Sequence, residues 1–451
     1  MDDIIKTEIE LHKQFKNLDV IGFDMDMTAV RYNNENIGSL VYDCISIHLK
    51  KVFPEAFKNS VIDFNFCKRG LVIDLETGLI LKLDNNKKVL KAFRGNHLVS
   101  REEIDELYHN HSIKEDSPMH SYSGNNCHRF FTMASFFETT LTCIFKDFMI
   151  YLEKEANATG KPIDLSQLKK LAKEIAVSFK THFDNFYDSH YYYEFCANPG
   201  KFIYKVNPKF LEWLKLIRSK GTKVLLITNS KSEYTDAVMK YSYGENFKDH
   251  FDCIIVDAHK PEFFSKDKPF VEQHTYFPKG PDDYIPCDSI KLNSNSIFKG
   301  GNVNIALNAI RESLQKSDSD EISFCYVGDN IMGDVVAPKK LKMMTVGIID
   351  EIVDPDEIII LKREKKTNED VSISKEGLIE KNLEKRDYEW GSFFHVHDNH
   401  KNISIDTFWG SILRNNADII TPSVDTLAEY YYQDKFDNYE TLSPCAVVYP
   451  E

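Results

Sequence analysis

The chain has 451 residues, 42% of them hydrophobic and 12% aromatic, which is enough for two or three domains with buried cores. Its formal net charge of −14 argues against a broad surface for nucleic acid. No apolar stretch approaches membrane-spanning length, the amino terminus lacks a signal-peptide pattern, and the nine cysteines form no CxxC pair. These features predict a cytoplasmic protein with reduced thiols that binds neither nucleic acid nor a membrane.

Four short apolar segments predict buried strands, and a polar cluster follows each of them. In chain order the segments are residues 18–23, 223–227, 251–258 and 322–327. A helix is predicted after Asn207, which fits an N-cap, with Pro208 as its first residue and Gly221 at its end. Residues 304–315 also carry apolar side chains at helical spacing. Strands that alternate with helices indicate an α/β fold, a parallel sheet with helices on both faces.

About 200 residues separate the first strand from the second, far more than a crossover needs, so they predict an inserted module. Residues 61–93 indicate strands with a turn at 76–78. Apolar side chains recur at helical spacing over 141–152 and 165–179. We therefore expect a helical cap over the active edge of the sheet.

These patterns divide the chain into a discontinuous core and three further parts. The core is predicted to cover residues 1–101 and 200–350, the helical cap 102–199, a charged linker 351–386, and a C-terminal segment packing on the core 387–451. The linker is predicted because residues 362–386 are dense in charge and poor in apolar side chains.

The polar clusters supply the residue types that phosphoryl transfer needs. Ligands of a parallel sheet bind beyond the carboxyl ends of its strands, so the four clusters are expected to form one site. The residues concerned are Asp24, Asp26, Thr228, Lys260, Asp329 and Asp334. A lone DxD pair would be weak evidence, but four strand ends that agree indicate a site for phosphate esters.

A catalytic role follows for four of these residues. Asp24 is the predicted nucleophile, because a carboxylate is ionised at neutral pH and can form an acyl phosphate. Asp26 is predicted to protonate the leaving oxygen and then to take a proton from water. Lys260 is expected to offset the charge of the phosphate and the nucleophile, and Thr228 to donate a hydrogen bond to a phosphate oxygen.

The carboxylates also predict a magnesium site. Mg²⁺ prefers a few carboxylates, water and a phosphate oxygen to a cage made wholly of protein. Asp24 and Asp329 are predicted to bind it through their carboxylates and Asp26 through its backbone carbonyl. Asp334 is predicted to hold a water bound to the metal.

The motifs DMDMT, ITNS, DAHKP and GDNIMGD, in this order, resemble those of the haloacid-dehalogenase superfamily. Within it, the chain resembles the cytosolic 5′-nucleotidases, and among them the 5′-nucleotidase domain-containing branch. The segments that carry this likeness are IGFDMDMTAVRY, RGLVIDLETGLILKLD, VDAHKPEFF, YVGDNIMGDV and WGSFF. The resemblance covers nearly all of the chain except the linker. It implies a Rossmann-like core, a helical cap inserted after the first motif, Mg²⁺ dependence and hydrolysis of nucleoside 5′-monophosphates.

Recognition of the base is where the chain departs from the purine nucleotidases. Aligned with them, the segment FFTMASFFETT has Ala134 where they carry an Asn, and Phe137 where they carry the Phe that holds the base. The resemblance therefore predicts base stacking on Phe137 without the polar contact. Packing inside the cap is an equal alternative for Phe137. Asn229 and Ser230 are further predicted substrate-binding residues.

Two other functions stay open beside nucleotide hydrolysis. One is a phosphatase of the same mechanism that acts on a sugar phosphate or another small phosphomonoester. The other is a binding or scaffold protein with low turnover, which the intact set of catalytic residues argues against. The expected partner is a small phosphate ester, and a homo-oligomer is compatible with the sequence.

Two further features could belong to sites of their own. The histidines His395, His397 and His400 lack the spacing of a helical HxxxH pair, so we expect loop residues rather than a second metal site. For Arg69, phosphate binding and a structural role are both open.

Overall fold

The computed structural model divides into two compact units, and each is described by itself. The residues described are 2–108, 113, 120–121, 129–184, 189–278, 283–292, 296–352, 390–398, 403–432 and 447–448. The sheet unit comprises Met1–Tyr32, Ile203–Val371 and Leu413–Glu451, and the inserted unit comprises Asn33–Phe202 and Ser372–Ile412. None of the described helices is both long and apolar enough to cross a membrane.

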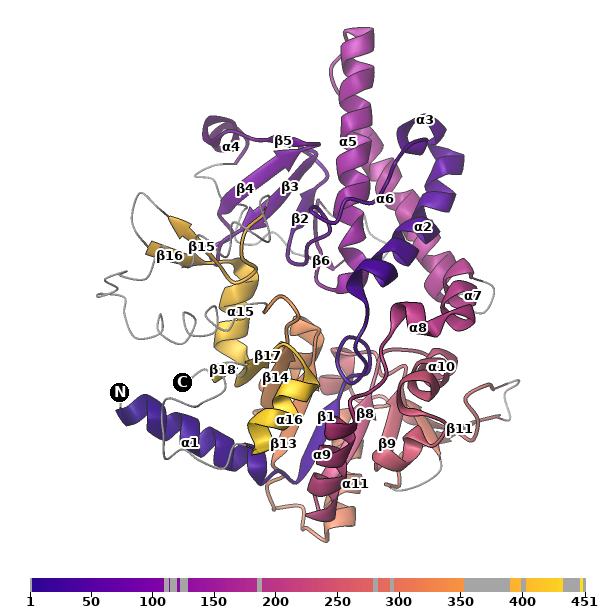
Figure 1. Cartoon of the computed structure of the whole chain (residues 1–451), viewed down its shortest axis with the longest axis vertical. Coiled ribbons are helices and arrows are strands. Elements are labelled where there is room, and N and C mark those ends of the chain that lie inside the picture. Colours follow the sequence, from indigo (N-terminus) through magenta and orange to yellow (C-terminus); the bar gives the residue numbers. More distant parts are fainter. Residues whose placement is uncertain are drawn as a thin grey trace. The chain divides into compact units, whose positions relative to one another are not determined.

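In the described residues of the sheet unit, ten strands form one sheet in the order β11-β10-β12-β9-β8-β1-β13-β14-β17-β18 (Figure 1). The strands are β1 Val20–Phe23, β8 Lys223–Ile227, β9 Cys253–Val256, β10 Phe270–Gln273, β11 Tyr284–Cys287, β12 Ile297–Gly300, β13 Phe324–Gly328, β14 Met344–Ile348, β17 Ile419–Thr421 and β18 Val447–Val448. Neighbours from β12 to β17 pair in parallel. The four predicted strands are β1, β8, β9 and β13, which lie side by side in the sheet, so this prediction is confirmed.

Helices cover both faces of this sheet. The helices of the unit are α1 Asp2–Lys16, α9 Pro208–Ser219, α10 Ser232–Tyr243, α11 Val303–Leu314, α12 Ala337–Lys339 and α16 Val424–Tyr432. Phe23 of β1 contacts the rings of Phe210 and Trp213 of α9, at 5.6 and 6.1 Å between centroids. Val20 lies an odd number of residues away and so faces the other side of the sheet, where it packs in one cluster with Ile310 of α11. The predicted α/β class is confirmed.

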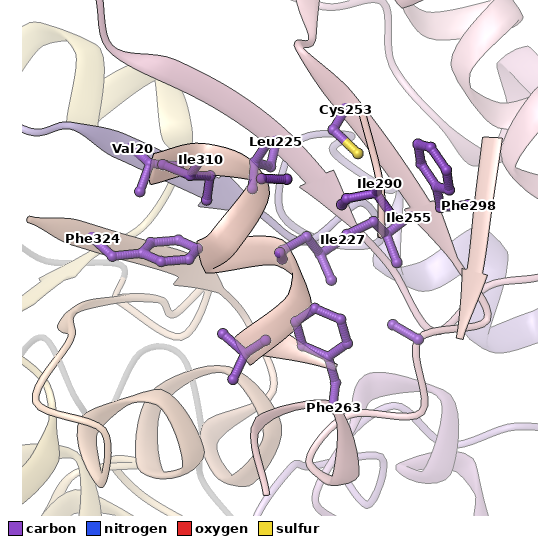
Figure 2. Close-up of a cluster of buried hydrophobic side chains, with 14 of the residues drawn as sticks. Val20, Leu225, Ile227, Cys253, Ile255, Phe263, Ile290, Phe298, Ile310 and Phe324 are labelled. Carbon is purple, nitrogen blue, oxygen red and sulfur yellow. The ribbon is translucent and has the colours of Figure 1, made fainter. Parts of the chain in front are cut away.

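The core under α11 joins the four strands that carry the motifs. Figure 2 shows Ile310 beside Val20 and Leu225, with Phe324 near them, and all four are at most 3% exposed. Burying such side chains is the main favourable term in folding. The predicted starts of both helices are close to those observed. The side chain of Asn207 accepts a hydrogen bond at the start of α9, and that of Asn302 does so at α11.

The inserted unit contains a sheet of its own, with strand order β5-β4-β3-β2-β7-β6 in the described residues. Its strands are β2 Val72–Asp74, β3 Leu79–Leu83, β4 Val89–Arg94, β5 His97–Leu98, β6 His120–Ser121 and β7 Phe130–Thr132, with a separate pair β15 His395–Asp398 and β16 Ile403–Asp406. Its helices are α2 Asn34–Val52, α3 Pro54–Phe57, α4 Arg101–Leu107, α5 Thr140–Thr159, α6 Ser166–Phe179, α7 His190–Ala197 and α8 Pro199–Phe202, while α15 Phe408–Asn416 crosses into the sheet unit.

The predicted turn between β2 and β3 is confirmed. The backbone N–H of Gly78 donates to the carbonyl of Asp74 at 2.9 Å. Gly78 has φ +72°, and a Cβ at this position would lie 2.6 Å from the sulfur of Met149. Only glycine fits both the left-handed backbone and this close approach.

The predicted boundary between core and cap is wrong. The core ends at Tyr32 rather than at residue 101, because β2–β5 pair within the inserted unit and not with the parallel sheet. The inserted unit is therefore mixed rather than purely helical, although the helices predicted over 141–152 and 165–179 are present as α5 and α6.

The first part of the C-terminal segment packs on residues that were assigned to the core and that belong to the inserted unit. The ring of Trp390 packs on Phe66 and Phe93, and its carbonyl accepts a hydrogen bond from buried Lys82, all within the inserted unit. From Leu413 onward the chain belongs to the sheet unit, where β17 pairs with β14. Nearly all of the predicted linker lies outside the described residues.

Candidate active site

The four sequence motifs meet at one edge of the parallel sheet. Asp24 directly follows β1, Thr228 follows β8 and Asp329 follows β13. Lys260 lies in the loop after β9. Because these strands are parallel neighbours, their carboxyl ends bring the residues together, as the sequence predicts.

Three carboxylates form the centre of the site. One oxygen each from Asp24, Asp329 and Asp334 lies within 4.8 Å of the others, and all three residues are buried. It is the one group of three or more possible metal ligands among the described residues, and His395 is not part of it. The side chains of His397 and His400 are not described. Crowded carboxylate oxygens away from water are the donor set that suits a hard divalent cation such as Mg²⁺.

The charge of this cluster is offset by one lysine. The Nζ of Lys260 lies 2.8 Å from Asp24 Oδ1 and 2.8 Å from Asp334 Oδ1. Burial by itself would lower the pKa of Lys260, but the attraction of the two carboxylates raises that pKa well above the ordinary value. Burial raises the pKa of Asp334 to about 7, with Lys260 opposing and Asp24 reinforcing the shift. Lys260 is thus a permanent cation between the nucleophile candidate and Asp334.

Tyr326 completes the surroundings of Lys260 and was missed in the sequence. Its hydroxyl accepts a hydrogen bond from Lys260 Nζ at 2.9 Å and donates to the carbonyl of Ile227 at 2.9 Å. The ring fits because residue 22 is glycine: a Cβ there would lie 2.9 Å from the Tyr326 ring. A glycine inside a buried strand often marks such a close approach. Gly22 was therefore the one sign in the sequence that a large side chain lies against β1.

The side chain of Asn229 forms two hydrogen bonds with the backbone of Lys260. Its Nδ2 donates to the Lys260 carbonyl at 3.0 Å, and its Oδ1 accepts from the Lys260 N–H at 2.6 Å. Asp257 and His259 in the same loop have φ of 48° and 58°, a left-handed conformation that is unfavourable for residues other than glycine. Asn229 thus braces this loop, and its predicted contact with substrate stays a prediction.

Asp26 is held through both of its carboxylate oxygens. Oδ1 accepts from the hydroxyl of Tyr32 at 2.5 Å, and Oδ2 accepts from that of Ser230 at 2.6 Å. Burial and the negative charge of Asp24 raise the pKa of Asp26 to about 6, against the opposing hydrogen bonds. Ser230, predicted to bind substrate, thus contacts the candidate acid. Thr228 is fully buried, and its hydroxyl accepts from the Ser230 N–H at 3.0 Å.

Phe137 and Arg69 belong to the inserted unit. Phe137 is half-buried in a 3₁₀ turn, Phe136–Glu138, and its predicted stacking on a base stays a prediction. Ala134 is buried. The guanidinium of Arg69 lies 4.8 Å from the ring centre of Phe136 and 5.2 Å from that of Phe393. Of the two roles left open for Arg69, this sandwich favours the structural one.

Comparison with known proteins agrees with the motifs. A model of the 5′-nucleotidase family matches residues 10–402. The chain is 26% identical to 5′-nucleotidase domain-containing protein 1 of Homo sapiens, over 97% of this chain and 96% of that protein. It is also 26% identical to the protein of the same name in Bos taurus, with the same coverage of both chains.

Similarity to solved structures is weak. A predicted phosphoglycolate phosphatase from Haemophilus somnus has a TM-score of 0.23 and 10% identity, covering 73% of this chain and 84% of that chain. A likeness of this size carries no argument about fold or function. The family model, by contrast, spans most of the chain and includes every catalytic residue predicted above. The chain therefore belongs to the 5′-nucleotidase family and is a phosphoric monoester hydrolase.

Proposed function

We propose that the protein hydrolyses nucleoside 5′-monophosphates to nucleoside and phosphate, depends on Mg²⁺, and works through an aspartyl-phosphate on Asp24. The observation that carries this proposal is the position of Lys260 Nζ, 2.8 Å from both Asp24 and Asp334 inside the group of buried acids. A permanent cation beside a carboxylate at the sheet edge is suited to attack on a dianionic phosphate.

In the first half of the proposed reaction, a carboxylate oxygen of Asp24 bonds to phosphorus. The bond between phosphorus and the ester oxygen breaks, and that oxygen takes the proton of Asp26. In the second half Asp26 takes a proton from water as the water oxygen bonds to phosphorus. This breaks the acyl phosphate and releases phosphate from Asp24.

The remaining residues are proposed to contact the phosphate and the metal. Lys260 offsets the negative charge of Asp24 and of the phosphate oxygens, and Thr228 is proposed to donate to one of those oxygens. Asp24, Asp329 and Asp334 would hold the metal. When bound, Mg²⁺ would neutralise charge on the phosphate during transfer.

Family membership supports the nucleotide as substrate, since the matching family is that of the 5′-nucleotidases. The described site residues of the sheet unit are all proposed to act at the phosphate end of the substrate. A sugar phosphate or another small phosphomonoester therefore stays the second candidate. Ala134, where purine nucleotidases have an Asn, is the observation that favours it.

A phosphate-release screen tests the proposal. Wild-type protein and Asp24→Asn are incubated with nucleoside 5′-monophosphates, sugar phosphates and p-nitrophenyl phosphate, with Mg²⁺ or with EDTA. We expect the wild type to turn over nucleotides best, and only with Mg²⁺. Preference for a sugar phosphate would overturn the assignment of nucleotides as substrates. Turnover in EDTA equal to that with Mg²⁺ would overturn the metal requirement. Turnover by Asp24→Asn equal to that of the wild type would overturn the assignment of Asp24 as the nucleophile.

A further inference from the structure

Two tyrosines that were given no role above lie beside Asp26. The hydroxyl of Tyr32 is 2.5 Å from Asp26 Oδ1, and the hydroxyl of Tyr234, from α10, is 3.1 Å from that of Tyr32. Both side chains are buried, with 7% and 5% exposed. The second oxygen of Asp26 accepts from Ser230, in the loop after β8.

The direction of these hydrogen bonds can be worked out. A tyrosine hydroxyl has one proton, and Tyr32 donates it to Oδ1 of Asp26. In the contact between the two hydroxyls, Tyr234 is therefore the donor. The chain Tyr234 to Tyr32 to Asp26 runs in one direction, so each hydrogen bond polarises and strengthens the next.

Donors on two sides fix the orientation of the Asp26 carboxylate. Each of the two carboxylate oxygens accepts one of these hydrogen bonds. The two donors come from different elements, the loop after β1 and the loop after β8, and a single orientation satisfies both. Tyr32 suits this task because its ring is rigid and buried, and Tyr234 sets the direction of its hydroxyl.

We propose that Tyr32, supported by Tyr234, is a positioning residue that sets Asp26 for proton transfer to the leaving oxygen. The inference rests on the proposed function, because it assumes that Asp26 is the acid. Lys260 contacts Asp24, Asp334 and Tyr326 instead, so the half of the site that attacks phosphorus is held separately. Loss of the Tyr32 hydroxyl should therefore slow proton transfer and leave phosphate binding intact.

The test uses two substrates that differ in their need for a proton. The nucleoside of a 5′-monophosphate leaves as an alkoxide unless its 5′-oxygen is protonated, whereas p-nitrophenolate leaves as a stable anion. For Tyr32→Phe in the full chain with Mg²⁺, we expect kcat/KM on the nucleotide to fall about tenfold or more, because this constant reports the steps up to departure of the leaving group. The kcat/KM on p-nitrophenyl phosphate should change by no more than about twofold. Inhibition by inorganic phosphate should be unchanged, and Tyr234→Phe should give the same pattern with a smaller factor.

Tyr243→Phe is the matched control. Its buried hydroxyl donates to the carbonyl of Ala29 at 2.8 Å, in the loop that carries Asp26, and makes no hydrogen bond to Asp26. This variant should shift the melting temperature without changing the ratio of the two kcat/KM values. If Tyr32→Phe fails to fold, the ratio in Tyr234→Phe decides.

Three results would overturn the inference: equal loss of kcat/KM on both substrates, no loss on either, or the same change of ratio in Tyr243→Phe. Asp24→Asn in the same assay keeps the two proposals apart. Wild-type turnover that this variant abolishes supports the proposed function whatever Tyr32→Phe does. Absence of wild-type turnover on both substrates would remove the proposed function and this inference together.

Discussion

Lys260 holds together two carboxylates that would otherwise repel each other. Its side chain is 3% exposed and contacts both Asp24 and Asp334. Replacing it by Met leaves two buried negative charges without their cation. For Lys260→Met in metal-free buffer at pH 8 we predict a loss of about 3–5 kcal/mol in the free energy of unfolding, measured with denaturant. Turnover with Mg²⁺ should fall about a hundredfold or more.

Lys266→Met is the control for this prediction. Lys266 pairs with Glu262 on the surface, where its side chain is 57% exposed. Water and salt screen such a pair, so its removal should change stability by no more than about 0.5 kcal/mol. Equal losses of unfolding free energy in the two variants would show that the buried ion pairs of Lys260 stabilise the fold no more than a surface pair does.

The pH dependence of stability follows from Asp334. Its folded pKa is raised from 3.8 to about 7, mainly by burial, so the folded state binds the proton more tightly than the unfolded state. Without metal, its contribution to stability is complete below about pH 4 and is lost as the pH rises through about 7. Mg²⁺ needs the ionised carboxylates, so its stabilising effect should grow over the same range.

Melting temperatures from pH 5 to 8, in EDTA and in Mg²⁺, measure this effect. Asp334→Asn removes the titrating group and keeps its shape, so the difference between wild type and variant isolates this residue from the histidines. We expect the pH slope in EDTA to be shallower in the variant and its response to Mg²⁺ to be weaker. Identical slopes would contradict the assigned role of Asp334.

At the scale of residues, what the sequence could predict depended on chemistry at strand ends. Asp24, Lys260 and Asp334 were predictable because their type and place answer the needs of phosphoryl transfer. Tyr32 and Tyr326 were not, because a buried tyrosine looks like a core residue until its hydroxyl has a partner across the fold. Asn229 and Ser230 were located correctly, but the groups they contact depend on loops distant in sequence.

At the scale of elements, α11 is held to the sheet by the cluster around Ile310, which is fully buried. Ile310→Ala removes methyl groups from a site that cannot collapse around the gap, and we predict a loss of about 2–5 kcal/mol in stability. Asn308→Ala, at an exposed position of the same helix, should stay within about 0.5 kcal/mol. Chemical denaturation of both variants measures the difference, and equal effects would contradict this packing.

Elements with a strong periodic pattern were predicted well. The helix after Asn207 and the four motif strands were found because caps and apolar runs are encoded locally. The partners of strands β2–β5 were not, since their apolar pattern fits any sheet. In the inserted unit the turn between two of these strands packs closely on α5, where a Cβ at Gly78 would lie 2.6 Å from the sulfur of Met149.

At the scale of the whole molecule, selectivity is expected to come from the inserted unit. If Phe137 stacks on the base, Phe137→Ala should lose about 1–3 kcal/mol of binding, which raises KM for a nucleotide about tenfold or more. KM for p-nitrophenyl phosphate should change less. Steady-state kinetics give KM for both substrates. The melting temperature, measured on the same preparation, shows whether the variant is also less stable.

Phe136→Ala serves as the neighbouring control, because the ring of Phe136 packs on Arg69. It should lower the melting temperature and affect both substrates alike. The same behaviour in Phe137→Ala would make Phe137 a packing residue. The assignment of nucleotides as substrates would then rest on family membership alone.

The division into two units was predicted in outline and misplaced in detail. An insertion was evident because no crossover needs about 200 residues. Its first border was set at residue 101 instead of Tyr32, because the apolar pattern of 61–93 predicts strands without showing which sheet they join. Residues 390–412 belong to the inserted unit, where the ring of Trp390 packs on Phe66 and Phe93. These contacts join residues far apart in the chain, so the local sequence does not predict them.

The most direct test of the central claim is to trap phosphate on the protein. Wild-type protein and Asp24→Asn are mixed with a substrate from the release screen that carries a labelled phosphate, quenched in acid within the first turnover, and digested. We predict label on the peptide that contains Asp24 in the wild type and none in the variant. Turnover without labelled protein, or label on any other residue, would contradict an aspartyl-phosphate mechanism at Asp24.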